Sequence, residues 1–90
     1  MIKAGVLGAG GMGAVHIKNL HGNEYVQLAA ICDTNEALAK QQAELYGTAY
    51  YTDGSTMLEQ EQLDVLYVCI PPFCHGDIEE QAAAKGIHLM

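Results

Sequence analysis

Residues 5–16 read GVLGAGGMGAVH, and this stretch decides the fold. Glycine fills five of its first nine positions, directly after an apolar run. Because glycine loses more backbone freedom on folding than any other residue, such a concentration needs a physical reason. Gly8, Gly10 and Gly13 have the spacing G-x-G-x-x-G, between a predicted strand and a predicted helix. That context is typical of a dinucleotide-binding βαβ unit, although a purely structural tight turn is the alternative.

Each glycine of the motif has a predicted role. Gly8 permits the sharp turn out of the strand, Gly10 leaves room for a diphosphate, and Gly13 lets the helix lie close to the sheet. The backbone amides of Gly11 and Met12 are expected to point at the phosphates, since a helix N-terminus favours an anion. The Met12 side chain has two interpretations, lying over the cofactor or covering the adjoining core.

An acidic residue follows at the position that a ribose-binding group requires. Asp33 stands twenty positions after Gly13, at the end of the second predicted strand. It is also a possible helix cap, but Thr34 and Asn35 are good caps and lie closer to the helical pattern. We therefore expect Asp33 to be free to accept from the ribose hydroxyls, and include Thr34 in the site. Its charge would repel a 2′-phosphate, so NAD is preferred over NADP.

Apolar runs alternate with helical patterns along the whole chain. The predicted strands are Ile2–Leu7, Val26–Cys32, Ala49–Tyr51, Val65–Ile70 and Ile87–Met90. The predicted helices are Gly11–Leu20, Asn35–Tyr46 ended by Gly47, Thr56–Gln60 capped by Ser55, and His75–Lys85. Short connections favour right-handed crossovers. We predict one α/β domain over residues 1–90, a Rossmann-type doubly wound parallel sheet of order 3-2-1-4-5, incomplete at its C-terminal edge.

A second segment is expected to border the cofactor. In this strand order ligands bind beyond the carboxyl ends of the strands where the winding reverses, which places Ile70, Pro71, Pro72 and His75 near the nicotinamide half. The prolines also end the strand, and a surface position is the alternative for His75. His16 is interpreted either as a packing residue or as a support for residues that touch the cofactor.

Composition limits the remaining functions. The sequence has eleven acidic and four basic residues, a net charge of −7, so nucleic-acid binding is not expected. The three cysteines indicate reduced thiols in a cytoplasmic protein. Cys74 beside His75 could suggest a nucleophile, but adjacent residues rarely face each other. Neither a metal-ligand spacing nor a membrane span is present in the sequence.

The motifs together resemble one family. The patterns G-x-G-x-M-G-x-x-H and P-P-x-x-H, at this spacing, are similar to the N-terminal domain of the glucose–fructose oxidoreductase, inositol dehydrogenase and rhizopine catabolism (Gfo/Idh/MocA) family. The resemblance implies a two-domain NAD(P)-dependent oxidoreductase acting on sugars, inositols or similar polyols. It carries cofactor contacts to Gly8, Gly10, Met12, Gly13 and Asp33, and to Ile70, Pro71, Pro72 and His75. Ile70 and Pro72 depart from the family's usual Thr and Asn.

The resemblance also implies what this chain lacks. The family's catalytic lysine lies in an E-K-P motif expected just after the fifth strand, and the sequence ends at Met90 before it. We therefore expect no catalytic residue in these ninety residues, an absent substrate domain, and no turnover by the chain alone. A non-catalytic nucleotide-binding module and a S-adenosylmethionine-dependent transferase are the alternatives. An exposed strand at Ile87–Met90 favours a homo-oligomer.

Overall fold

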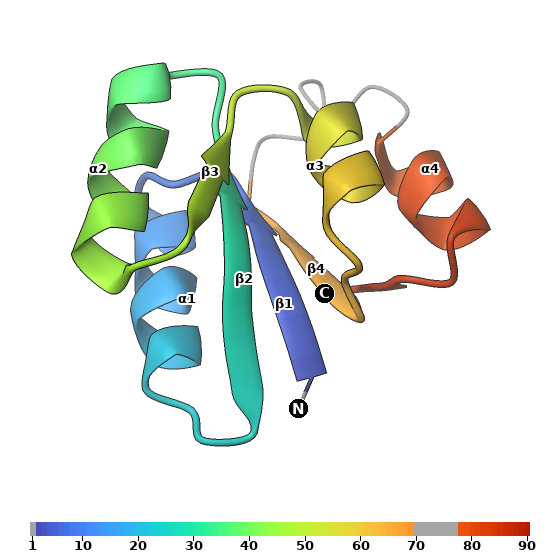
Figure 1. Cartoon of the computed structure of the whole chain (residues 1–90), viewed down its shortest axis with the longest axis horizontal. Helices are drawn as coiled ribbons and strands as arrows, with labels where there is room; N and C mark the ends of the chain where they lie inside the picture. Colours follow the sequence, from blue (N-terminus) through green and yellow to red (C-terminus); the bar gives the residue numbers. More distant parts are fainter. Residues whose placement is uncertain (1, 70–77) are drawn as a thin grey trace.

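The computed structural model describes residues 2–69 and 78–90, apart from the side chain of Met12. Five strands form one parallel sheet in the order β3-β2-β1-β4-β5, which confirms the predicted Rossmann-type fold (Figure 1). The strands are β1 (Ile2–Leu7), β2 (Val26–Cys32), β3 (Ala49–Tyr51), β4 (Val65–Val68) and β5 (His88–Leu89). The helices are α1 (Met12–His21), α2 (Glu36–Tyr46), α3 (Gly54–Gln60) and α4 (Ile78–Ala84).

Helix α3 begins differently from the prediction. Ser55 was expected to cap a helix starting at Thr56, but α3 starts at Gly54 and its N-cap is Asp53. The Asp53 backbone is extended, and its carboxylate accepts hydrogen bonds from the Thr56 amide (3.2 Å) and the Thr56 hydroxyl (2.8 Å). A carboxylate that satisfies two donors is the better cap, so the predicted start was wrong.

The other boundaries differ by a few residues at most. Helix α2 starts at Glu36, one residue later than predicted, because Asn35 is its N-cap; it ends at Gly47 in the left-handed conformation, as expected. Strand β5 covers only His88–Leu89, shorter than predicted. The predicted end of the fourth strand at Ile70 and the predicted helix start at His75 lie outside the described residues.

Two apolar layers hold the helices on opposite faces of the sheet (Figure 1). Side chains of a strand alternate between the faces, so Val6 of β1 packs with Ile17 of α1, whereas Leu7 packs with Met57 of α3. Helices α1 and α2 thus cover one face, and α3 and α4 cover the other. The winding changes face between β1 and β4, where a doubly wound sheet opens a crevice at its carboxyl edge.

Candidate functional site

The loop after β1 turns sharply at two glycines. Gly8 has φ 101° and Gly11 has φ 54°, a region that side-chain-bearing residues rarely adopt. The Gly8 amide donates to the Cys32 carbonyl oxygen at 2.7 Å, so the loop leaves the sheet directly beside the end of β2. The predicted role of Gly8 as the turn residue is confirmed.

Gly13 and Gly10 differ in what surrounds them. A Cβ atom on Gly13 would lie 1.8 Å from the Gly8 carbonyl oxygen, so α1 approaches β1 as closely as backbone allows. Of the described part of the chain, a Cβ on Gly10 would meet only the Leu38 side chain, at an ordinary 3.5 Å. Gly10 is exposed, whereas Gly13 is buried. Close packing therefore requires glycine at position 13, and the space over Gly10 is open to a ligand.

The N-terminus of α1 carries the positive end of the helix dipole. Its N-cap is Gly11, no side chain among the described residues hydrogen-bonds to this cap, and no acidic residue lies in the first turn. The Gly13 amide donates to the Gly10 carbonyl oxygen at 3.0 Å, which closes the turn ahead of the helix. Such an end, with exposed glycines, is chemically suited to an anion. The Met12 side chain, one of the predicted contacts, lies outside the described part of the structure.

Asp33 lies against this loop. Its Oδ2 accepts a hydrogen bond from the Ala9 amide (2.9 Å), and its Oδ1 accepts one from the Asn35 amide (2.8 Å). Asn35, not Asp33, caps α2, as expected. Each oxygen of Asp33 already accepts one backbone hydrogen bond, which the sequence did not predict. An ionised carboxylate has about four acceptor positions, so capacity remains for the two hydroxyls of a ribose.

The Ala9–Asp33 hydrogen bond had no signal in the sequence. Ala9 contributes a backbone amide, and every residue except proline has one. Thr34, the other predicted contact on this side, is exposed next to Asp33. The structure therefore brings Gly8, Gly10, Gly11, Gly13, Asp33 and Thr34 to one edge of the sheet.

Two cysteines near this edge are poor nucleophiles. Burial, reinforced by the charges of Asp53 and Asp33, raises the pKa of Cys32 to about 11. Burial also raises the pKa of Cys69. A thiolate is the reactive form, so neither side chain is activated at neutral pH. Cys74, and the predicted contacts Ile70, Pro71, Pro72 and His75, fall in the segment that the structure does not describe.

The described histidine nearest the loop is engaged in packing. The ring of His16 on α1 lies 5.3 Å, centroid to centroid, from that of Tyr67 on β4. This contact is consistent with a packing role for His16. Within the described ranges no group of three or more His, Cys, Asp or Glu side chains could hold a metal ion. No described helix has the length and apolar character that crossing a membrane requires.

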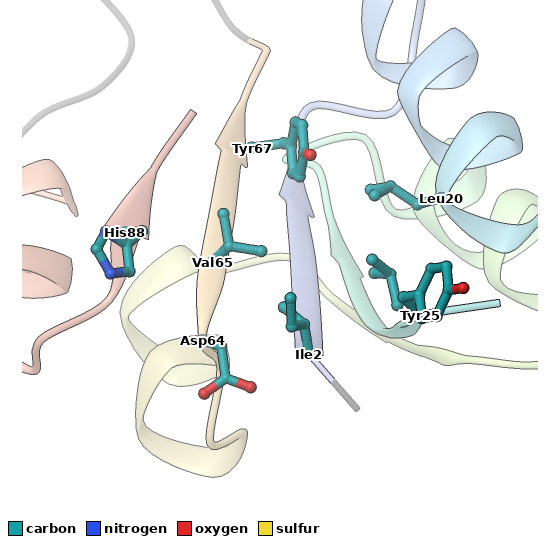
Figure 2. A pocket seen from close by; sticks show the side chains of 8 residues that line it. Ile2, Leu20, Tyr25, Asp64, Val65, Tyr67 and His88 are labelled. Carbon is teal, nitrogen blue, oxygen red and sulfur yellow. The ribbon is translucent and has the colours of Figure 1, made fainter. Parts of the chain in front are cut away.

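A hollow of about 770 Å³ lies outside the candidate site (Figure 2). It lies at the amino ends of β1, β2 and β4, and none of its lining residues belongs to the predicted site. Its lining is Ile2, Leu20, Tyr25, Val26, Asp64, Val65, Tyr67 and His88. Since this surface is mainly apolar and lacks the glycine-rich loop, we place the candidate site at the carboxyl edge.

Two inositol 2-dehydrogenases are similar to this chain over most of its length. An inositol 2-dehydrogenase of Rhizobium meliloti (strain 1021) is 33% identical over 85 residues, which are 94% of this chain and 26% of that protein. An inositol 2-dehydrogenase of Pseudarthrobacter chlorophenolicus is 32% identical over 91 residues, covering 99% of this chain and 27% of that protein. The chain thus spans about a quarter of the length of these relatives.

Solved structures have the same fold. A myo-inositol dehydrogenase from Corynebacterium glutamicum ATCC 13032 superimposes with a TM-score of 0.90 at 25% identity, over 99% of this chain and 27% of that one. GenD2 from gentamicin A biosynthesis, solved in complex with NAD, gives 0.89 at 26% identity, over 98% and 25%. The family model for oxidoreductases with an NAD-binding Rossmann fold matches residues 2–90. The chain therefore belongs to this oxidoreductase family, Gfo/Idh/MocA.

Proposed function

We propose that these residues bind NAD at the carboxyl edge of the sheet. The diphosphate would accept hydrogen bonds from the amides of Gly11 and Met12 at the start of α1, over the open space at Gly10. The adenosine ribose would donate its hydroxyls to Asp33, with Thr34 beside it. Ile70, Pro71, Pro72 and His75 are proposed to border the nicotinamide half.

One observation carries this proposal: the Asp33 carboxylate is hydrogen-bonded to the glycine-rich loop through the Ala9 amide. The anion-binding end of α1 and the ribose acceptor are therefore contiguous. A molecule that joins a diphosphate directly to a ribose fits both at once. Within residues 2–69 and 78–90 no side chain caps α1, which supports the same conclusion, because a phosphate would satisfy that helix end.

The same carboxylate supports NAD rather than NADP. A 2′-phosphate would be placed next to Asp33, whose charge would repel it, and like charges in contact cost several kcal/mol. Thr34 and Asn35 offer no positive charge to offset this repulsion. Titration calorimetry of the folded chain with NADH and NADPH tests both points. We expect NADH to bind at least about tenfold more tightly. Absence of any NADH binding would refute the proposal.

The reaction of the whole protein is a further proposal. Relatives carry the names inositol 2-dehydrogenase and glucose-6-phosphate 3-dehydrogenase, which supports a polyol or sugar substrate. NAD, when bound, accepts or returns the hydride of the substrate's carbinol carbon. This chain's residues would bind and orient the cofactor, while a lysine and a substrate domain outside these ninety residues would complete the site. An assay of the chain alone with NAD and polyols should show no reduction of the cofactor.

Location and assembly are proposed on separate grounds. Reduced cysteines support a cytoplasmic protein, and the described thiols of Cys32 and Cys69 are unpaired. The outer edge of β5 and the apolar hollow beside it support self-association of the chain, since such surfaces promote pairing.

A further inference from the structure

We infer that Asp33 is a positioning residue for the glycine-rich loop, in addition to its proposed contact with the ribose. The inference starts from the hydrogen bond between its Oδ2 and the Ala9 amide, 2.9 Å long and 24 residues apart in sequence. Ala9 lies between Gly8 and Gly10, at the centre of the turn that leads to α1. The carboxylate therefore acts on the backbone of the loop before any ligand arrives.

The loop depends on this contact because Ala9 is fully buried. A buried backbone amide is almost always paired, and here the partner is a side chain. The flanking Gly8 amide is instead held by the Cys32 carbonyl oxygen, within the sheet ladder. Removing Asp33 would therefore leave the Ala9 amide as a buried donor without its acceptor, at the point where the loop leaves the sheet.

Asp33 is itself held in place by two further hydrogen bonds, one to its side chain and one from its backbone. Its other oxygen accepts from the Asn35 amide at 2.8 Å, next to the start of α2. Its own amide donates to the Tyr51 carbonyl oxygen at 3.1 Å, which ties it to β3. The glycine-rich loop is thus connected through one side chain to β3 and α2. Such a fixed group can define the loop geometry, whereas a mobile surface carboxylate cannot.

This inference rests on the proposed function for its ligand, and it makes a distinct prediction. If Asp33 only accepts from the ribose, its removal cannot affect a ligand without ribose hydroxyls. Loss of its negative charge would then strengthen diphosphate binding, because one repulsion disappears. If Asp33 positions the loop, its removal weakens binding of such a ligand. The two roles predict effects of opposite sign.

The experiment compares ADP with 2′,3′-dideoxy-ADP on the wild-type chain and on Asp33→Ala, by NMR titration. Asp53→Ala is the matched control, because it removes a capping carboxylate of equal charge from α3. We expect Asp33→Ala to weaken binding of 2′,3′-dideoxy-ADP by about tenfold, the size of one hydrogen bond to a charged acceptor. Asp53→Ala should leave it within about twofold. Unchanged or tighter binding of 2′,3′-dideoxy-ADP to Asp33→Ala would overturn the inference.

Amide hydrogen exchange gives a readout that needs no ligand. In Asp33→Ala the Ala9 amide should exchange at least about tenfold faster, while the Gly8 amide, bonded within the sheet, changes much less. If Asp33→Ala does not fold, Asp33→Asn takes its place, because its side chain has one acceptor oxygen for the two amides of Ala9 and Asn35. Faster exchange of the Ala9 amide in Asp33→Asn then supports the inference. Wild-type exchange at Ala9 in the folded variant overturns it. Failure of the wild-type chain to bind ADP or NADH would refute the proposed function alone, because the exchange experiment still decides the role of Asp33.

Discussion

Gly13 rests directly on the backbone of Gly8: a Cβ atom at position 13 would lie 1.8 Å from the Gly8 carbonyl oxygen and 2.7 Å from its carbonyl carbon. The obstacle is backbone, and it cannot retreat easily, since the Gly8 amide is bonded to Cys32 in the neighbouring strand. The third glycine of the motif is therefore required by the packing of α1 on the sheet, whether or not a ligand is bound.

Gly13→Ala should accordingly destabilise the fold severely. Because neither side of the contact can move without breaking sheet or helix hydrogen bonds, we expect a loss of about 3 kcal/mol or more in the free energy of unfolding. Urea denaturation followed by circular dichroism measures this loss. A Gly13→Ala chain with the stability of the wild type would show that α1 can shift away from β1 at little cost.

Gly10→Ala should leave the stability of the fold nearly unchanged and weaken NADH binding instead. Its Cβ would make only an ordinary contact with Leu38, so stability should change by less than about 1 kcal/mol. The added methyl group would, however, occupy the space assigned to the diphosphate, and NADH affinity should fall by about tenfold. Gly22→Ala, at the other end of α1, is the control for both measurements, because a Cβ there also meets nothing closer than 3.7 Å. Equal NADH affinity in all three chains would contradict this assignment of Gly10.

The central strands could be predicted to the residue. The edge strand Ala49–Tyr51 has its predicted bounds, and so do Ile2–Leu7 and Val26–Cys32, which contribute side chains to both apolar layers. Such strands read as apolar runs in the sequence. Strand β5 was predicted too long. It pairs only with β4: the Met90 backbone is still hydrogen-bonded to Leu66 and Val68, whereas the Ile87 amide donates to helix α4 instead.

The start of α3 and the hydrogen-bond partner of Asp33 could not be predicted, for a different reason. Asp53, Ser55 and Thr56 are all residue types that cap helices, and only the extended backbone at Asp53 decides among them. The partner of Asp33 is a backbone amide, which is the same for alanine as for nearly any residue. Contacts of this kind depend on where the chain passes in space, so residue types alone do not reveal them.

Cys32 should resist alkylation in the folded chain. It is 1% exposed, and burial together with two aspartates raises its pKa to about 11, so almost no thiolate forms at pH 8. Iodoacetamide labelling followed by peptide mass spectrometry should show slow modification of Cys32 in buffer and rapid modification in guanidinium chloride. Cys69, which is only partly buried, should react faster than Cys32. Rapid labelling of Cys32 in buffer would mean that the β2 end opens frequently.

Self-association of the chain should depend on the β5 edge. Leu89 is 38% exposed on that strand, and a lysine there would place charge where another strand would pair. Leu89→Lys should therefore shift the chain toward monomer in light scattering at high concentration. Leu45→Lys is the matched control, since Leu45 is 68% exposed on α2 away from this edge. An equal shift from both substitutions would indicate a general charge effect. A monomeric wild-type chain at high concentration would refute the proposed self-association.

Tyr51 should make the stability of the fold sensitive to alkaline pH. Its hydroxyl donates to a Glu61 carboxylate oxygen, and this hydrogen bond, with a contribution from burial, raises the pKa of Tyr51 from 10.0 to about 12. A raised folded-state pKa means that the contribution is complete below pH 10 and is lost as pH rises through about 12. Removing the hydroxyl should cost about 1 kcal/mol at neutral pH.

Tyr51→Phe tests this dependence by difference. The gap in unfolding free energy between wild type and Tyr51→Phe should be constant up to pH 10 and then close toward pH 12. Other groups that titrate in this range, including the Cys32 thiol, are present in both chains and cancel in the difference. Tyr50→Phe, at the adjacent position of β3, controls for loss of an exposed tyrosine. A Tyr51→Phe gap that stays constant to pH 12 would show that the bond to Glu61 does not form in solution.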